Sequence, residues 1–536
     1  MSAPREPLPL PWWLRGSFWR WVVRVAAALV LLALTLATWV LLYPPSLGPV
    51  RQDLQELVSR KLHRKVSFDT LTWTWSNGLK VRVTGVELGS KALRVQKVRL
   101  GVKLLPLLRG EVRFQGLELV GLDLPLERRA DGRLFAGGFY MDPDRNLIFP
   151  LLARFGHFRI THSTLRWRDR VPGHPVRVAL RDWRVDVHRQ GTAHRVEVHG
   201  SLGNGEVEAR GRIRDFGQGP SGWRLDVRMA AAGLAPDTIR PYLGDRGPDR
   251  LLGRLAFRAD VQGGLGAGVE VTGRAALRGG GVRWPARLRA PLEGLEARGR
   301  FRYRLDAKGQ DLELRALKLQ RGPLTVTGQG GLRLAKGDGG PRVDLDLRSG
   351  SVELEDLDPF YRLRALPPKL RSWLQEALAG RIVRTHMVLH GPLARFPFPD
   401  NQGRFRVEAE VQDVRLDYHH GWPPLEGLAG TLVLDGRRLA FSNGSARILR
   451  ARVSGLGASV HDFAARPPRL RLHGTVDLNL LDGARFLERS GLVEPGFLDP
   501  GVLVGGGRLE LGLELPLGGE EAPEVYGTLH LQRAAY

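Results

Sequence analysis

The sequence predicts a mainly β protein: an extended, curled antiparallel β-sheet with a few short helices, preceded by one N-terminal transmembrane helix. Three observations predict this fold. Most of the chain alternates apolar and charged residues with a period of two, turn signals recur between these segments, and one long uncharged run lies near the N-terminus. Strands with one solvent-exposed face are typical of antiparallel sheets, because the strands of βαβ units are apolar on both faces and are separated by helices.

The length and composition are those of a long folded body. The chain has 536 residues, 43% hydrophobic and 26% charged, which suits several domains or one repetitive body. The 67 Gly and 35 Pro indicate many turns. Because there is no Cys, disulfides, thiolate metal sites and cysteine nucleophiles are excluded.

The net charge of +25 invites a nucleic-acid function, which the distribution of the charges disfavours. Only 10 of the 81 basic residues are Lys, and the basic residues are spread along the polar phase of the alternating segments without a long block. We therefore interpret the charge as an Arg-rich solvated surface and expect no nucleic-acid partner.

The first element in chain order is a predicted membrane anchor at residues 25–43, VAAALVLLALTLATWVLLY. As a helix, this uncharged run would cover roughly 28 Å, enough for the core of a bilayer. Aromatic residues suited to the two membrane interfaces lie on either side: Trp19 and Trp21 before the run, Trp39 and Tyr43 at its end.

The charges around this run predict its orientation. Arg15, Arg20 and Arg24 precede it, whereas only Arg51 follows closely. The positive-inside rule therefore places residues 1–24 in the cytoplasm and the bulk of the chain outside it. A cleaved signal peptide is the alternative and would give the same orientation.

A short amphipathic helix is expected next, because Leu54, Leu57, Val58 and Leu62 share one helical stripe. Further helices are predicted at 237–243, 367–380 and 482–492. In the helix at 367–380, Pro367 and Pro368 mark the start and Gly380 the end. Its Trp373 lies on the apolar stripe, either packed in a core or placed as a lid.

The rest of the chain is predicted to be strand. Asn77-Gly78, Asp131-Gly132 and Asp435-Gly436 are hairpin signals between such strands. The apolar faces of several strands supply the candidate functional residues, which are Phe301, Tyr303, Leu305, Val343, Leu345, Leu347, Phe405, Val407, Val411, Leu432 and Leu434. Roughly 30 strands at about 4.8 Å each would extend on the order of 140 Å.

An alternating sheet must hide its apolar face, and two arrangements do so. A closed barrel or sandwich hides it against itself. A long curled sheet leaves a groove suited to acyl chains. Periodicity leaves both open.

Two stretches carry a resemblance to a known family. In residues 50–135, a short helix, a strand and LLPLLRGEVRFQGLEL resemble the N-terminal region of AsmA-like envelope proteins. Further on, a glycine-ended helix is followed by Phe396-Pro397-Phe398, by a strand at 403–407 and by the Tyr-x-x-x-Trp-Pro-x-Leu element at 418–425. This order is similar to that of the YhdP branch of the same superfamily.

The resemblance implies a protein anchored in the bacterial inner membrane by a single pass, with the bulk of the chain in the periplasm. It implies a β-groove that moves phospholipid between the inner and outer membranes and supports the outer-membrane barrier. Phospholipid acyl chains, the inner membrane, and outer-membrane or periplasmic proteins are then the expected partners. YhdP-like proteins are considerably longer, and the chain ends in the strand-like EVYGTLHLQRAAY, so a truncated form is expected.

The predicted organisation is a cytoplasmic N-terminus at 1–24, the anchor at 25–43, an AsmA-like β module at 44–140, a central β-groove at 141–400 and its continuation at 401–536. No clear domain boundary is predicted within the body, only soft ones near residues 140, 355 and 400.

No motif for catalysis, phosphate binding or a cofactor is found, so we predict neither an enzyme nor a metal site. His157 and His162 lie five apart in a strand and so should point to opposite faces. His419 and His420 diverge for the same reason, and Asp417 adds at most one further ligand on one face. The alternatives to lipid transport are an envelope scaffold or assembly factor built from closed β-sandwiches and, more weakly, a hydrolase whose site is not visible in the sequence.

Overall fold

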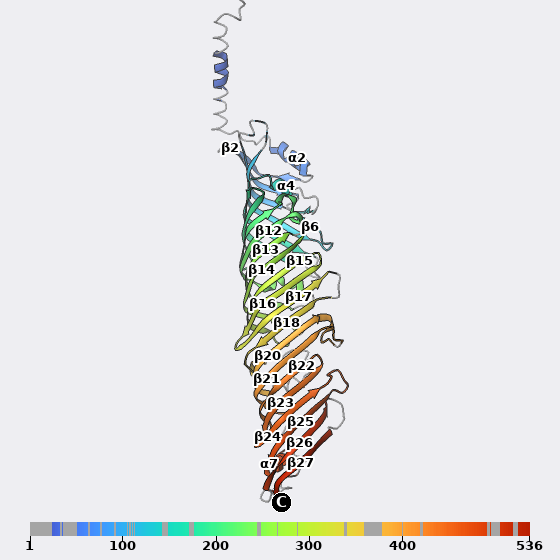
Figure 1. Cartoon of the computed structure of the whole chain (residues 1–536). Coiled ribbons are helices and arrows are strands. Elements are labelled where there is room, and N and C mark those ends of the chain that lie inside the picture. The colour runs from blue at the N-terminus through green and yellow to red at the C-terminus, as the bar shows by residue number, and fades with distance from the viewer. Residues whose placement is uncertain are drawn as a thin grey trace, which may run out of the picture.

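Figure 1 shows the computed structural model of the chain, an elongated body in which strands follow one another from the N-terminal to the C-terminal end. The structure describes residues 24–32, 51–62, 65–75, 78–89, 93–103, 113–141, 148–170, 176–243, 248–264, 266–286, 288–336, 340–357, 378–398, 400–418, 422–489, 504–517 and 524–535, with the single residues 35, 106, 109, 111 and 494.

The described residues contain a 27-stranded sheet. Its N-terminal part consists of β1 (Val66–Ser67), β2 (Thr70–Trp75), β3 (Leu79–Leu88), β4 (Leu93–Val102), β5 (Phe114–Arg128), β6 (Leu134–Ala136), β7 (Phe139–Tyr140), β8 (His157–Asp169), β9 (Val176–Gln190), β10 (Ala193–Leu202), β11 (Gly205–Arg214), β12 (Arg224–Leu234) and β13 (Arg250–Gly264). The remainder consists of β14 (Gly268–Arg283), β15 (Leu292–Asp306), β16 (Gly309–Arg321), β17 (Leu324–Ala335), β18 (Arg342–Ser349), β19 (Val352–Glu353), β20 (Leu378–Pro392), β21 (Arg404–Leu416), β22 (Leu425–Asp435), β23 (Arg438–Ile448), β24 (Ala451–Val460), β25 (Arg469–Asn479), β26 (Val504–Pro516) and β27 (Glu524–Ala535).

Consecutive strands pair antiparallel along most of this sheet, as the alternation predicts. The exception is the step from β5 to β8, which is parallel. From β2 to β27 the path takes 22 strand-to-strand steps, which at about 4.8 Å each extend roughly 105 Å. This is shorter than expected because the sheet has 27 strands, and four of them, β1, β6, β7 and β19, lie beside the path.

The sheet does not close on itself among the described residues, so the closed-sandwich arrangement is wrong. Pairing also continues past residues 355 and 400, through β20 and β21. The division of the body into modules stays a prediction. Two predicted hairpin signals are confirmed, Asp131-Gly132 between β5 and β6 and Asp435-Gly436 between β22 and β23; Asn77 lies outside the described residues.

Helices are few and short. They are α2 (Arg51–Leu62), α4 (Ile148–Leu152), α7 (Leu480–Arg489), and the 3₁₀ helices η2 (Phe216–Gln218), η3 (Pro220–Gly222), η4 (Pro236–Leu243), η5 (Leu354–Leu357) and η6 (Leu393–Arg395). The helices predicted after the anchor and at 482–492 are confirmed by α2 and α7. The segment at 237–243 is helical too, as the 3₁₀ helix η4.

The helix predicted at 367–380 is wrong at its C-terminal end. Leu378, Ala379 and Gly380 begin β20. Gly380 has φ of 131°, and a Cβ there would lie 2.6 Å from the carbonyl oxygen of Asp413, so it is a glycine required by close strand pairing. Residues 367–377, including Trp373, lie outside the described residues.

The predicted anchor lies largely outside the described residues, as do Trp19, Trp21, Trp39 and Tyr43. Residues 24–32 are helical. Within the part of the chain that the structure describes, no helix is both long and apolar enough to cross a membrane.

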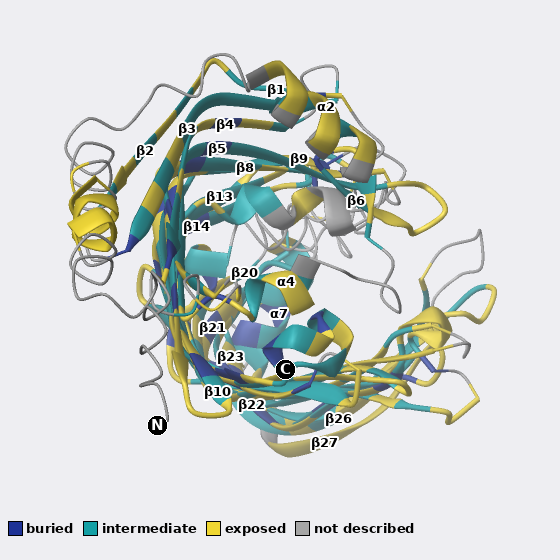
Figure 2. Ribbon diagram, turned by 90° about the horizontal axis from the view of Figure 1, so that it is seen from above, coloured by how far each residue is buried: buried dark blue, intermediate teal, exposed yellow. Residues whose placement is uncertain are grey.

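Bulges bend the sheet. They recur in most of the long strands, and left-handed residues mark many of them, including Asp182, Ala316, Asp413 and Asn443. Each extra residue bends its strand and increases the local twist, so repeated bulges curl the whole sheet. Figure 2, a view along the long axis, shows the sheet curving around a central axis with α4 and α7 on its concave side.

The parallel step between β5 and β8 relies on a buried hydroxyl. Pairing skips from Val120–Thr161 to Asp123–Thr164, which leaves the amide of Leu122 without a partner strand carbonyl. Ser163, only 1% exposed, accepts a hydrogen bond from this amide at 2.9 Å and donates one to the carbonyl of Thr161 at 2.8 Å.

Ser163→Ala is therefore expected to destabilise this step by about 1–3 kcal/mol, because a buried amide loses its acceptor. Hydrogen exchange of β5 and β8 measures the effect locally. Ser201→Ala, which removes an exposed hydroxyl on β10, is the control and should change protection little. Equal protection in both variants would contradict the role of Ser163.

Candidate functional site on the concave face

All eleven predicted lining residues lie on one face of the sheet. The strand register places Phe301 opposite Leu314, Leu345 opposite Leu389, and Leu389 opposite Phe405. The remaining predicted residues keep the same parity, which is Tyr303, Leu305, Val343, Leu347, Val407, Val411, Leu432 and Leu434. Their contact with lipid stays a prediction.

These residues belong to apolar rows that cross the sheet through directly paired positions. The first, the Phe301 row, runs from β2 to β21 without a polar residue: Leu71, Val83, Val98, Leu119, Ile160, Val185, Val198, Ala209, Met229, Ala259, Gly273, Phe301, Leu314, Gly330, Leu345, Leu389 and Phe405.

A second row takes over towards the C-terminal end. This Leu347 row runs from β16 to β26 through Leu317, Gly328, Leu347, Met387, Val407, Leu434, Leu439, Val460, Leu470 and Leu515. Both rows cross β16, β17, β18, β20 and β21, so an apolar path extends from β2 to β26. The eleven residues predicted from the sequence are members of these rows or lie on the same face. The strand pairing that joins the rows is visible only in the tertiary structure.

The rows lie on the concave side of the sheet. Ile160 and Val185 of the Phe301 row belong to a buried cluster against which Leu152 of α4 packs. Figure 2 places α4 inside the curve of the sheet. Because no bulge changes the parity within a directly paired row, its other members face the same side.

The extent to which the concave face is buried varies along the molecule. Near α4, Phe158, Ile160 and Val187 are buried. In the central strands the apolar residues are half-buried, and Leu305 and Leu334 are exposed. A contiguous apolar surface of this extent in a folded protein indicates a ligand or an interaction site.

The opposite, outer face carries ion pairs within strands and between neighbouring strands. Arg406 lies 3.2 Å from Asp435 and 3.1 Å from Glu408, and Arg304 lies 3.0 Å from Glu270. Such exposed pairs each contribute little stability. Much of the charge in the alternating segments is therefore located on the outer face.

An aromatic cluster packs at the N-terminal part of the concave side. Phe149 of α4 contacts Phe216 of η2 and Trp223 edge-to-face, at centroid distances of 5.6 and 5.0 Å. His194 lies 4.8 Å from the Phe216 ring, is buried, and both its ring nitrogens lack a hydrogen-bond partner. Burial, and secondly Arg189, lowers the pKa of His194, so the imidazole is neutral and packs as an aromatic ring.

The Tyr-x-x-x-Trp-Pro element packs against α7. Trp422 contacts Tyr418 and Phe486 edge-to-face, at 6.0 and 5.7 Å between centroids. Burial raises the pKa of Tyr418 to about 12. This element is therefore part of the packing that positions α7 against β25 and β26.

The histidines considered in the sequence analysis lie in different structural settings. His419 and His420 lie outside the described residues, and Asp417 pairs with Arg415 at 3.3 Å. His162 sits at a bulge, which breaks the strict alternation assumed for it, and lies 3.3 Å from Asp182.

His157 belongs to a cluster that sequence reasoning missed. It lies beside Asp186 and His188 on the outer face. The available signal was the Asp-x-His spacing in β9, which puts Asp186 and His188 on one side of a strand. Only the register of β8 against β9 adds the third residue.

A family model described as YhdP protein matches residues 1–284 and 267–536. A search of curated proteins and a search of solved structures each gave no match.

Proposed function

The chain belongs to the YhdP family, and from this premise we propose that its concave apolar face carries phospholipid between the inner and outer membranes of a bacterial envelope. One observation supports this function most: the apolar rows continue from β2 to β26 on the concave side, while charged residues occupy the outer face.

The physical basis is ordinary burial. An acyl chain that leaves water gains about 0.8 kcal/mol per CH₂ group. Because every residue of the Phe301 row and the Leu347 row is apolar, the three glycines included, this gain recurs from strand to strand and no deep trap forms. Headgroups remain at the open, wet side of the curved sheet.

On this proposal, residues 25–43 anchor the chain in the inner membrane with the N-terminus in the cytoplasm. The body then lies in the periplasm, supports the outer-membrane barrier and meets outer-membrane or periplasmic protein partners. The chain acts as a conduit and not as an enzyme.

The proposal predicts that phospholipid contacts one face only. A photo-crosslinking p-benzoylphenylalanine at Leu389, in the Phe301 row, should capture phospholipid in membranes of cells that express the full chain. The matched control is Val388, the adjacent residue, which faces outwards opposite Asp346 and Arg406. Mass spectrometry of the crosslinked chain identifies the lipid.

Strong lipid labelling at Leu389 and background labelling at Val388 is the expected result. Equal labelling at both positions, or none at Leu389, would contradict lipid transport along the concave face. In that case a scaffold that docks partners on this face would be the better function.

A further inference from the structure

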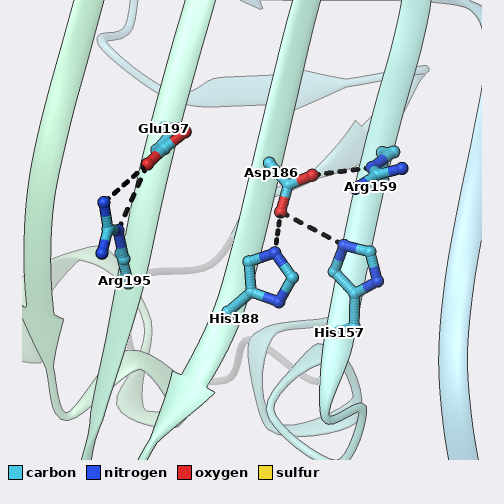
Figure 3. Close-up of polar contacts among 6 residues, drawn as sticks. All are labelled: His157, Arg159, Asp186, His188, Arg195 and Glu197. Carbon is cyan, nitrogen blue, oxygen red and sulfur yellow. Dashed lines mark hydrogen bonds and ion pairs between the residues drawn. The ribbon is translucent and has the colours of Figure 1, made fainter.

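The outer face holds three metal-ligating side chains in one place. His157 of β8 and His188 of β9 are directly paired across the two strands, and their rings stack at 4.1 Å with an interplanar angle of 5°. Asp186 lies on the same side of β9 and points between the two rings, as Figure 3 shows.

The donor atoms converge on one carboxylate oxygen. Oδ1 of Asp186 lies 3.1 Å from Nε2 of His157 and 2.5 Å from Nε2 of His188. One ligand atom from each residue fits within 4.8 Å of the others. Ligands of a tetrahedral zinc ion, at about 2.0–2.1 Å from the metal, lie roughly 3.3 Å apart, so small side-chain rotations suffice.

From this geometry we propose that His157, Asp186 and His188 bind a divalent transition-metal ion that bridges β8 and β9. Two imidazoles and a carboxylate suit zinc, copper(II) or nickel(II) better than calcium or magnesium, which prefer oxygen ligands. Water would complete the coordination, since the three side chains are 34%, 18% and 49% exposed.

Two arginines are held in positions that favour this use. Nε of Arg159 donates to Oδ2 of Asp186 at 2.6 Å, which fixes the carboxylate so that Oδ1 faces the two imidazoles. Arg195 of β10 lies opposite His188 of β9. Its guanidinium donates to Glu197 of its own strand, at 3.0 and 3.2 Å, and not to Asp186. Figure 3 shows both contacts. Outer partners of this kind orient metal ligands.

Protonation favours binding as well. Burial lowers the pKa of His157, and neighbouring His188 and Arg159 act in the same direction against the attraction of Asp186. Burial tends to raise the pKa of Asp186, but the Arg159 hydrogen bond and charge lower it overall. A neutral imidazole beside a carboxylate is the form that a metal ion requires.

Other His–Asp contacts among the described residues lack the second imidazole. His162–Asp182, His386–Asp346 and His390–Asp344 are pairs, at 3.3, 2.9 and 3.5 Å. His386 and His390 lie four residues apart in one strand, roughly 13 Å, and so are too distant to share an ion. These pairs therefore serve as internal controls.

The test titrates ZnCl₂ into the full chain in detergent, prepared without a polyhistidine tag and stripped with a chelator, against a chromophoric chelator. One zinc ion per chain is expected. His157→Ala and His188→Ala should each weaken binding at least about tenfold, since loss of even an outer partner costs about 10–100-fold. His162→Ala, on the same strand as His157, should leave affinity unchanged.

A second measurement needs no variant. Zinc should protect His157 and His188, but not His162, from diethylpyrocarbonate, as mapped by mass spectrometry. No saturable zinc binding, unchanged affinity in both ligand variants, or equal modification with and without zinc would each overturn the site. The cluster would then be a hydrogen-bonded contact between β8 and β9.

Discussion

The double variant Leu345→Asp/Leu347→Asp is expected to stop phospholipid movement while the sheet stays folded. Leu345 lies in the Phe301 row and Leu347 in the Leu347 row, both on β18, a strand that both rows cross. An acyl chain passing this strand would have to cover ionised carboxylates, at a cost of several kcal/mol. Because 1.4 kcal/mol corresponds to a factor of ten, transfer should fall at least about tenfold.

The matched control is Thr325→Asp/Thr327→Asp on the neighbouring strand β17. These residues face outwards, and Thr327 lies opposite Lys318 and Arg348, where a carboxylate is favourable. Both double variants add the same charge to adjacent strands. Outer-membrane permeability to detergent and lipid crosslinking at Leu389 should change only for the concave variant.

Circular dichroism separates loss of transport from loss of folding. Leu345 and Leu347 are half-buried, so their replacement leaves the carboxylates in reach of water. Wild-type barrier function and lipid crosslinking in a folded Leu345→Asp/Leu347→Asp variant would rule out the concave face as the path.

The largest stability effect is expected from Asp169→Ala at the parallel step. Asp169 is 0% exposed and binds Arg128 through both carboxylate oxygens, with Nε of Arg128 donating to Oδ1 at 2.9 Å. Removing one partner of a buried pair costs about 3–5 kcal/mol. The lower end is expected, since the Arg128 side chain is 36% exposed and can turn to water.

Hydrogen exchange of β8 is the suitable measurement, because a long sheet of stacked strands unfolds locally rather than all at once. Arg128→Met/Asp169→Leu should recover most of the lost protection, since apolar groups of similar size replace the pair without an unpaired charge. The interpretation fails if the double variant is less protected than Asp169→Ala.

The alternation of apolar and charged residues was a sufficient guide to the strands and their faces. Phe405, Val407 and Val411 were placed on one side by period alone, and the register agrees. Short helices with a clear stripe, such as α7, were also predictable. Gly380 was not, because a glycine that ends a helix and one that permits close strand pairing look alike in sequence.

Bulges and register are the features that local patterns missed. The bulge at Asp413 brings Val411 and Val414 to one cluster although they are three residues apart. The cluster of His157, Asp186 and His188 depends on the pairing of two strands, which sequence spacing within each strand does not contain.

The sequence by itself determined which residues alternate, that the sheet is antiparallel along most of its length, and that one face is apolar, because side chains in a strand project to opposite sides every second residue. Only the tertiary structure decided that the sheet curls without closing and that its apolar residues join into continuous rows. Curl comes from bulges accumulated over many strands, and row continuity comes from register between residues far apart in the chain.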